Sequence, residues 1–401
     1  MMEKSEVLLS AVVLLLGTFA DAADNHCGVC HPREKVEFEN SIHRIELVAC
    51  SDCHGGDPAS TESDRAHRGS FLSLKDRRTI PDSCAGCHAD PSKMRPYNLP
   101  ADQKLLYDTS HHGKLLARGD VNAAVCSDCH GSHRILPPED PASPVSPENV
   151  PRTCSRCHAD AGMIKQYGLD PSIPERFETG VHGRELLGKG NDSAPDCARC
   201  HGAHGAAPPG VGDINKVCGS CHSRERWAFV AGPHYEAFAD VGLPECASCH
   251  GNHDVRGFEI DGAESLCLEC HEVESKPLAL SRRMCVAIEA ARIEVEKATE
   301  LIDRAAKIPI DVEDYLARVV DARAVLSDLP VVMHSSLADP VESLALRARS
   351  IGEEVQHDIY AKFSQRTAWR IVLVAVWFYV LMTVAILAVY KARLGAGRDG
   401  R

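Results

Sequence analysis

The stretch that decides the fold is CSDCHGSHRI, residues 126–135, in which four side chains able to bind a metal lie within eight residues. Cys126 and Cys129 are followed at once by His130, and His133 comes three residues later. The pattern C-x-x-C-H occurs nine times and uses 18 of the 19 cysteines. Disulfides or zinc sites would also use paired cysteines, but neither requires a histidine directly after the second one.

The spacing predicts covalent haem of the c type. Two thiols three residues apart on one helical turn can add to the two vinyl groups of one haem, and the next residue then faces the iron as its proximal ligand. We therefore expect nine covalently bound haem c groups. The predicted attachment residues are Cys27, Cys30, Cys50, Cys53, Cys84, Cys87, Cys126, Cys129, Cys154, Cys157, Cys197, Cys200, Cys218, Cys221, Cys246, Cys249, Cys267 and Cys270. The predicted proximal iron ligands are His31, His54, His88, His130, His158, His201, His222, His250 and His271.

The haem motifs follow a repeat. Four times an aromatic residue is followed five residues later by a histidine, and a C-x-x-C-H comes shortly after. Three of these opening motifs continue as C-H-G-x-H, and a second C-x-x-C-H closes each unit. We interpret the region as four two-haem units plus one N-terminal haem at Cys27–His31. The histidines outside the motifs are predicted to be distal ligands, each on the sixth position of an iron: His43, His67, His112, His133, His182, His204, His234 and His253.

One distal ligand is missing from this count. Nine irons need nine distal ligands, and the repeats supply eight. His26, His111 and His334 are the candidates for the ninth, and His111 is favoured because it adjoins His112. If none of them serves, one iron is five-coordinate.

Composition predicts what kind of core residues 23–275 have. Aromatic residues are only 5% of the chain, and Gly, Pro, Asp and Ser interrupt every potential helix here. Such a segment cannot bury enough apolar side-chain area for an ordinary core. We expect a multihaem cytochrome c domain with little regular secondary structure, in which stacked haems form the core and short helices and loops surround them.

With these motifs the chain resembles the multihaem c-type cytochromes, the broad group that includes class III cytochromes c, NapC/NirT-like quinol dehydrogenases and octahaem hydroxylamine oxidoreductase-like proteins. The resemblance covers residues 24–275 and implies closely stacked haems, bis-histidine ligation and electron transfer. NapC-like proteins carry an N-terminal anchor, whereas the apolar anchor here is C-terminal. Cytochrome c nitrite reductases are less similar, because their catalytic C-x-x-C-K is absent from this sequence.

Both ends of the chain carry apolar segments. Residues 1–22 are predicted to be a signal peptide with an A-x-A site at Ala20–Ala22, although a weak charged region leaves an uncleaved anchor open. Ile371 to Tyr390 is an uncharged run long enough to span a bilayer, within a predicted transmembrane helix at 367–391. A buried core helix is the alternative. Basic residues in the tail, 392–401, favour a cytoplasmic C-terminus, with the haem domain in the periplasm or outside the cell.

Residues 276–366 are predicted to form a helical neck. From Met284 to Ala305 and from Tyr315 to Met333, apolar residues recur at alternating spacings of four and three, and Pro309 separates the two helices. A third helix is expected to begin with Asp339 as its N-cap and to continue into the membrane segment. The neck resembles the C-terminal bundle of hydroxylamine oxidoreductase-like proteins, or serves only as a spacer. The last cysteine, Cys285, is expected to be a small buried residue or to form an intermolecular disulfide.

Two functions remain open from the sequence. The expected one is non-catalytic electron transfer between a membrane quinol pool and soluble periplasmic redox proteins. We expect an integral membrane quinol-oxidising subunit, such as a b-type cytochrome, to link them; a quinol site where the haem domain meets the lipid surface is the alternative. The alternative is a haem enzyme that acts on a small nitrogen or sulfur compound at one five-coordinate iron. The formal net charge of −13 argues against nucleic acid and favours a basic soluble partner.

Overall fold

The computed structural model describes residues 25–207, 214–257 and 262–396, so the predicted signal peptide lies outside the described residues. Within these ranges the chain is helical and contains no β-strand. It forms two compact units, Met1–Pro209 with Asn252–Arg256, and Gly210–Gly251 with Gly257–Arg401. The last predicted two-haem unit therefore belongs largely to the same compact unit as the neck, and only the loop after its opening motif belongs to the first.

Each C-x-x-C-H motif lies on or at the end of a short helix. Glycine, proline or a turn follows within a few residues, and this keeps the helices to about one or two turns. These helices are α1 (Cys27–Cys30), α4 (Cys50–His54), α6 (Ile80–His88), α10 (Cys126–His130), α11 (Val150–His158), α15 (Cys197–His201), α16 (Ile214–Gly219), α19 (Ala247–His250) and α20 (Ala263–Cys267).

The segments between the motifs are also short helices joined by turns. In the first compact unit they are α2 (Pro32–Glu39), α3 (Ile42–Ile45), α5 (Ser63–Ala66), α7 (Pro91–Met94), α8 (Gln103–Thr109), α9 (His111–Ala117), α12 (Ala161–Ile164), α13 (Ile173–Thr179) and α14 (Val181–Gly183). In the second they are α17 (Ser223–Val230) and α18 (Pro233–Val241). The expected short helices and loops are therefore present.

The region of short helices has little apolar core of its own. Among its described residues from 25 to 275, nine apolar side chains are buried, against twenty in residues 276–366. Its one cluster of packed buried residues consists of Leu116, Ala123 and Val125. Polypeptide of this length normally buries far more apolar surface when it folds, so its stability must depend on something besides its own side chains.

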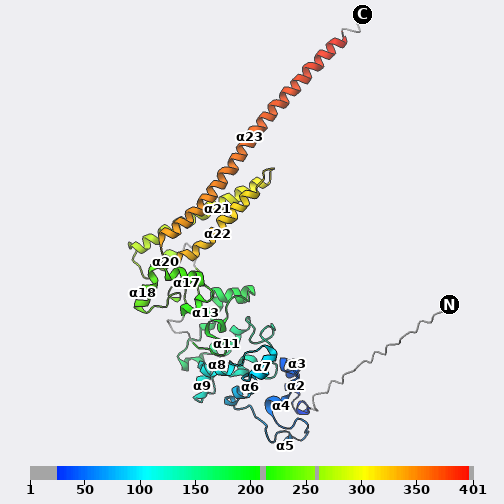
Figure 1. Ribbon diagram of the computed structural model, residues 1–401, viewed down its shortest axis with the longest axis vertical. Helices are drawn as coiled ribbons and strands as arrows, with labels where there is room; N and C mark the ends of the chain where they lie inside the picture. Colours follow the sequence, from blue (N-terminus) through cyan, green and yellow to red (C-terminus); the bar gives the residue numbers. More distant parts are fainter. Residues whose placement is uncertain (1–24, 208–213, 258–261, 397–401) are drawn as a thin grey trace, which may run out of the picture. The chain divides into compact units, whose positions relative to one another are not determined.

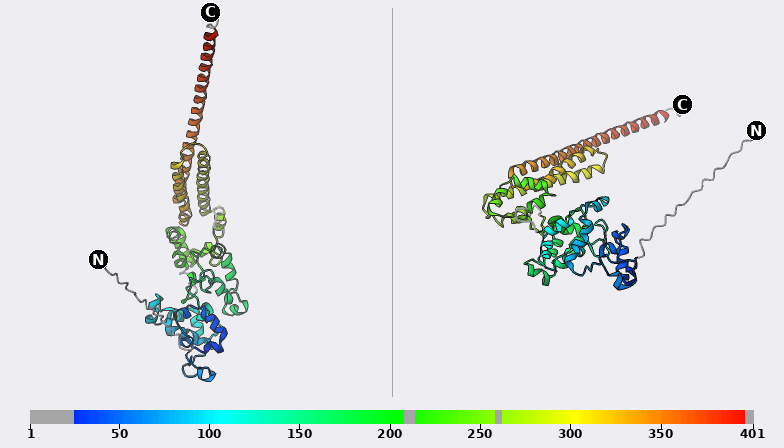
Figure 2. Two further views of the ribbon diagram at one scale, coloured as in Figure 1. Left: turned by 90° about the vertical axis from the view of Figure 1, so that its right-hand side faces the viewer. Right: turned by 60° about the horizontal axis from the view of Figure 1, so that its bottom comes forward.

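The neck is a bundle of three long helices: α21 (Lys276–Ala306), α22 (Glu313–Met333) and α23 (Ala338–Ala396). α21 and α22 form a hairpin that packs along the first part of α23, as two views show (Figures 1 and 2). Pro309 lies in the turn between α21 and α22, as predicted. The third helix begins at Ala338, two residues before Pro340, so Asp339 lies in its first turn and is not its N-cap.

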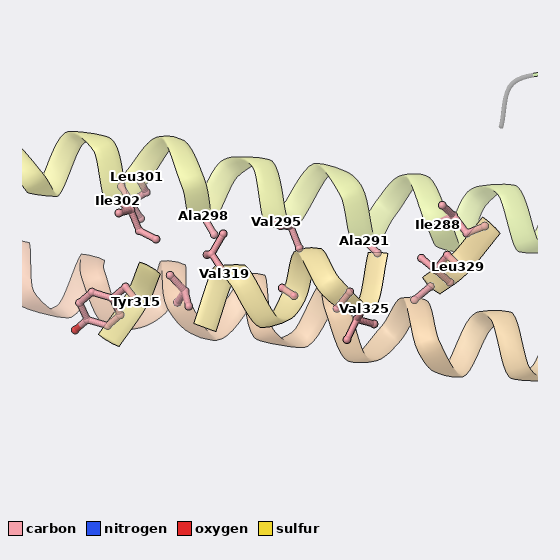
Figure 3. Packing of buried hydrophobic residues seen from close by; sticks show 14 of the residues in the cluster. Ile288, Ala291, Val295, Ala298, Leu301, Ile302, Tyr315, Val319, Val325 and Leu329 are labelled. Carbon is pink, nitrogen blue, oxygen red and sulfur yellow. The ribbon is translucent and has the colours of Figure 1, made fainter. Parts of the chain in front are cut away.

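The predicted apolar stripe of α21 is buried along its whole length, from Met284 to Ala305. Its side chains point into the space between the three helices (Figure 3). Several contacts are made by alanine or glycine, which lets the backbones approach closely. A Cβ added to Gly352 of α23 would lie 2.8 Å from the carbonyl carbon of Glu294 on α21.

α23 continues beyond the hairpin as one uninterrupted helix (Figure 1). Among the described residues it is the helix long and apolar enough to cross a membrane. The side chains from Ile371 to Tyr390 are almost all exposed, which is unlike a buried core helix. An exposed apolar surface of this length needs cover, and a bilayer would supply it.

Candidate functional site

Histidine rings from the motifs lie against histidine rings from outside them. In eight pairs within the described part of the chain, a histidine that follows C-x-x-C faces a second histidine, with ring centroids 5.8–6.3 Å apart. The pairs are His31–His67, His43–His88, His54–His133, His112–His158, His130–His204, His201–His253, His234–His271 and His250–His334.

The constant separation of the rings is informative. A metal–nitrogen bond to imidazole is about 2 Å long and the ring centroid lies about 1 Å further, so two imidazoles on opposite sides of one metal have centroids about 6 Å apart. The angle between the ring planes, by contrast, varies from 8° to 89°. Direct ring packing links distance to angle. Two rings that share a metal axis keep their distance and can rotate freely about that axis, as observed here.

Hydrogen bonds orient several of these rings through Nδ1. The Nδ1 of His67 lies 2.9 Å from the carbonyl oxygen of Ser63, and that of His334 lies 2.7 Å from the carbonyl oxygen of Pro330. His54 and His201 approach backbone carbonyls at 3.3 Å in the same way. A ring that donates its Nδ1 hydrogen presents the lone pair of Nε2, which is the arrangement that histidine ligands of metals usually adopt.

Burial favours the neutral form of eight of the paired histidines. Loss of solvent and the nearby His204 together lower the pKa of His130 to about 4. Burial also lowers the pKa of seven others: His43, His88, His112, His158, His204, His234 and His253. A neutral imidazole has a lone pair available for a metal, so no proton has to be displaced at neutral pH.

The repeat predicted from the sequence has a structural counterpart. The backbone N–H of Ile42, just before His43, donates to the carbonyl oxygen of Ile135, two residues after His133, at 2.8 Å. Two further bonds follow the same rule, at 2.9 Å: His111 N–H to Ala206, and Val181 N–H to Val255. Each C-H-G-x-H loop is therefore fixed to the segment that carries the distal histidine of the preceding unit.

Cysteines of successive motifs are also neighbours. A hydrogen bond between the thiols of Cys84 and Cys126 raises the pKa of Cys84 and lowers that of Cys126. Here one cysteine comes from the motif that closes a unit and the other from the motif that opens the next. The same contact joins two further pairs, Cys154 with Cys197 and Cys218 with Cys246.

Other cysteines from successive motifs are also neighbours. Burial and the nearby thiol of Cys50 raise the pKa of Cys27. Burial together with Cys87 raises the pKa of Cys53, and burial together with Cys154 raises that of Cys129 to about 11. The first six motifs thus follow one another in space as they do in sequence, and the seventh neighbours the eighth.

An aspartate inside two of the motifs holds the motif helix. The carboxylate of Asp128 accepts the N–H of Val125 at 2.7 Å, and Asp52 accepts that of Ala49 at 2.7 Å. Asp128 is in turn bonded by both terminal nitrogens of Arg77, at 3.1 and 2.5 Å. These bonds satisfy N–H groups at the start of a very short helix and favour the spacing of its two cysteines.

The alternatives to haem gain no support from this geometry. All nineteen cysteines lie in the described part of the chain, and none forms a disulfide there. Cys285 is half-buried on α21. Among the described residues no group of three or more His, Cys, Asp or Glu is arranged to hold a metal ion. A zinc site needs four such ligands, whereas a haem iron takes four nitrogens from its own macrocycle and needs only two from the protein.

Most of the predicted distal histidines, but not all, belong to these ring pairs. Seven of the eight from the repeats belong to the ring pairs, and His182 lies on α14. His111, which was favoured for the ninth position, belongs to none of the eight pairs. His334, which was ranked below it, pairs with His250. The distal partner of His222 stays a prediction.

No family model, no curated protein and no solved structure matches this chain.

Proposed function

We propose that this chain is a membrane-anchored c-type cytochrome with nine haems that carries electrons on the outer side of the cytoplasmic membrane. The observation that carries the proposal is the set of eight histidine pairs, each with a motif histidine and each with the separation that one iron would impose. Two axial histidines leave an iron with no open position. This favours electron transfer over the alternative, an enzyme with a five-coordinate iron.

The residues fit the group they would hold. Every motif presents two thiols next to a histidine, and eight of these histidines have a second histidine ring opposite them. The scarcity of buried apolar side chains between residues 25 and 275 leaves room for a core that the polypeptide does not supply. Bound haem would supply reversible one-electron chemistry at iron.

The proposed path for electrons follows the order of the motifs. Cys84 touches Cys126 and Cys154 touches Cys197, so haems attached at these cysteines would lie side by side. Because tunnelling falls off exponentially with distance, short gaps between neighbours decide whether electrons pass. The polypeptide would hold each axial histidine and set the spacing between neighbouring haems.

The anchor argues for a separate membrane partner. α23 is continuous from Ala338 to Ile371, which at about 1.5 Å per residue is about 50 Å of helix. The His250–His334 pair lies at the start of this helix, far beyond one tunnelling step from the apolar segment. Electrons from a quinol would therefore enter through a quinol-oxidising membrane subunit, such as a b-type cytochrome. That subunit would have to extend from the membrane to the haem near the His250–His334 pair. The acidic surface suits basic soluble acceptors in the periplasm.

Covalent haem counting tests the proposal. The full chain is expressed in a bacterium that assembles c-type cytochromes, and its intact mass is compared with an iron and haem determination. Nine covalent haems per chain are expected, all low-spin and six-coordinate by electron paramagnetic resonance. A protein without covalent haem would contradict the proposal. A stoichiometric high-spin iron that binds nitrite or hydroxylamine would favour the enzyme.

A further inference from the structure

We propose that His334, in the turn between neck helices α22 and α23, is the distal ligand of the haem attached at Cys246 and Cys249. The neck would then be part of the haem-binding structure and not only a spacer. This inference rests on the proposed function, because it needs haem at that motif. It assigns the ninth distal ligand to a residue outside the repeats, in place of His111.

The first argument is the order of the pairs. The opening motif of each unit is faced by the histidine of the next unit's C-H-G-x-H loop: His133 faces His54, His204 faces His130, and His253 faces His201. The fourth opening motif, with His250, has no further repeat after it. His334 takes that place, with ring centroids 6.0 Å apart and 19° between the planes. It therefore stands where a fifth unit would have supplied its histidine.

The second argument is how the backbone docks. Two residues before the distal histidine of the third unit, Gly180 is so close to the loop of His253 that an added Cβ would lie 3.0 Å from the carbonyl oxygen of His253. Gly232 occupies the same position in the fourth unit, and its added Cβ would collide with the carbonyl oxygen of Ser335. Both glycines have extended backbones. The turn of His334 thus docks on the fourth unit much as a C-H-G-x-H loop docks on the third.

The third argument is the orientation of the ring. α22 ends at Met333, so the carbonyl of Pro330 has no N–H four residues later within the helix. Nδ1 of His334 lies 2.7 Å from that oxygen and serves as its donor. Capping the helix and binding iron are therefore compatible roles, because the capping bond uses Nδ1 and presents Nε2.

The same turn also contacts a second histidine pair. Ser336 Oγ lies 3.0 Å from Nδ1 of His234, whose ring is 6.0 Å from that of His271. Ser336 has a left-handed backbone (φ 54°), an unusual conformation for serine that makes the turn tight. Arg224, at the start of α17, binds Asp328 of α22 at 2.7 Å and helps to keep the turn in place. Two haem sites are thus tied to one turn of the neck.

The experiment compares the full-length protein with His334→Ala, using electron paramagnetic resonance and magnetic circular dichroism. We expect that one iron of nine becomes high-spin while all nine haems stay attached, and that added imidazole restores the low-spin signal. His334→Met should keep nine low-spin irons, one with a raised potential, since thioether ligation raises it. The controls are His111→Ala and His357→Ala, the latter exposed on α23, and both should leave nine low-spin irons.

Each contrary result has its own meaning. Nine low-spin irons in His334→Ala, or a high-spin iron in His111→Ala, would overturn the assignment and leave the proposed function standing. A parent protein without covalent haem would remove both. If His334→Ala does not accumulate, His334→Met decides, because nine irons with unchanged potentials would contradict direct ligation.

Discussion

The imidazole ring of His130 lies 6.0 Å from that of His204, with only 8° between the ring planes. His130 belongs to the second predicted two-haem unit and His204 to the loop that follows the opening motif of the third. A unit of this repeat therefore does not complete its own first site. Every histidine of an opening motif faces a ring from a later segment of the chain.

Replacing His204 with alanine should convert one iron from low to high spin and leave nine haems attached, because attachment depends on Cys126 and Cys129. Electron paramagnetic resonance of the oxidised protein measures the high-spin signal, and mass spectrometry counts the haems. His357→Ala is the control, since that exposed side chain belongs to no ring pair. An unchanged spectrum in His204→Ala would show that the ring pair does not report ligation.

Replacing Cys126 with alanine should weaken the attachment of one haem and lower the stability of its neighbours. Cys126 lies next to the packed residues Ala123 and Val125, the small core that the haem would complete. The expected result is a loss of one haem in part or all of the protein and a lower unfolding midpoint. Cys285→Ala, outside the motifs, should keep nine haems. Equal haem content and stability in the two variants would contradict the haem-core argument.

Arg77→Ala should destabilise the second unit by about 1 kcal/mol, a value reduced because both partners are about one-third exposed. The change removes two bonds to Asp128 and one to the carbonyl oxygen of Ala123 at 3.0 Å. Denaturant unfolding followed by circular dichroism measures the difference. Arg78→Ala is the matched control, because Arg78 pairs with the exposed Asp76 only two residues away. A larger loss for Arg78→Ala would refute the role given to Arg77.

Gly352→Ala should destabilise the neck although alanine favours helix by about 1 kcal/mol. The added Cβ would lie 2.8 Å from backbone atoms of Glu294, which cannot move aside as a side-chain end can. Forcing α21 and α23 apart should cost about 1–3 kcal/mol. Thermal unfolding of the purified protein measures the balance, with the exposed Ser343→Ala as control. A stabilised Gly352→Ala would show that the helices separate easily here.

Periodicity made the neck predictable. The four-and-three spacing from Met284 to Ala305 identified a buried stripe, because helical geometry alone puts those residues on one face. Pro330 inside α22 could not be interpreted in this way. It lies in the last turn, where it removes one helix hydrogen bond and favours the end of the helix, and its carbonyl meets Nδ1 of His334.

The histidine pairs were predictable only in part. The repeat identified which histidines were available as distal ligands. It could not identify His334, which belongs to no repeat and is 84 residues from His250 in the sequence. Adjacency to His112 pointed instead to His111, whose backbone N–H donates to Ala206. Only the folded position of the turn between α22 and α23 distinguishes the two.

The last prediction concerns where electrons enter. A chain that ends before Ala368 keeps the whole packed bundle, since the last side chain packed against its core is Phe363. It should be soluble, retain nine haems and accept electrons from dithionite, yet lose reduction by menaquinol in membranes.

A second version, with 371–390 replaced by an unrelated apolar helix, separates anchoring from recognition. If anchoring alone matters, this version regains menaquinol-dependent reduction; if α23 recognises a subunit in the bilayer, it stays unreduced. The membrane-extracted parent should co-purify with an integral membrane subunit in either case. Rapid quinol oxidation by the purified chain alone in liposomes would contradict the argument from α23, because about 50 Å of helix separates His334 from the apolar segment.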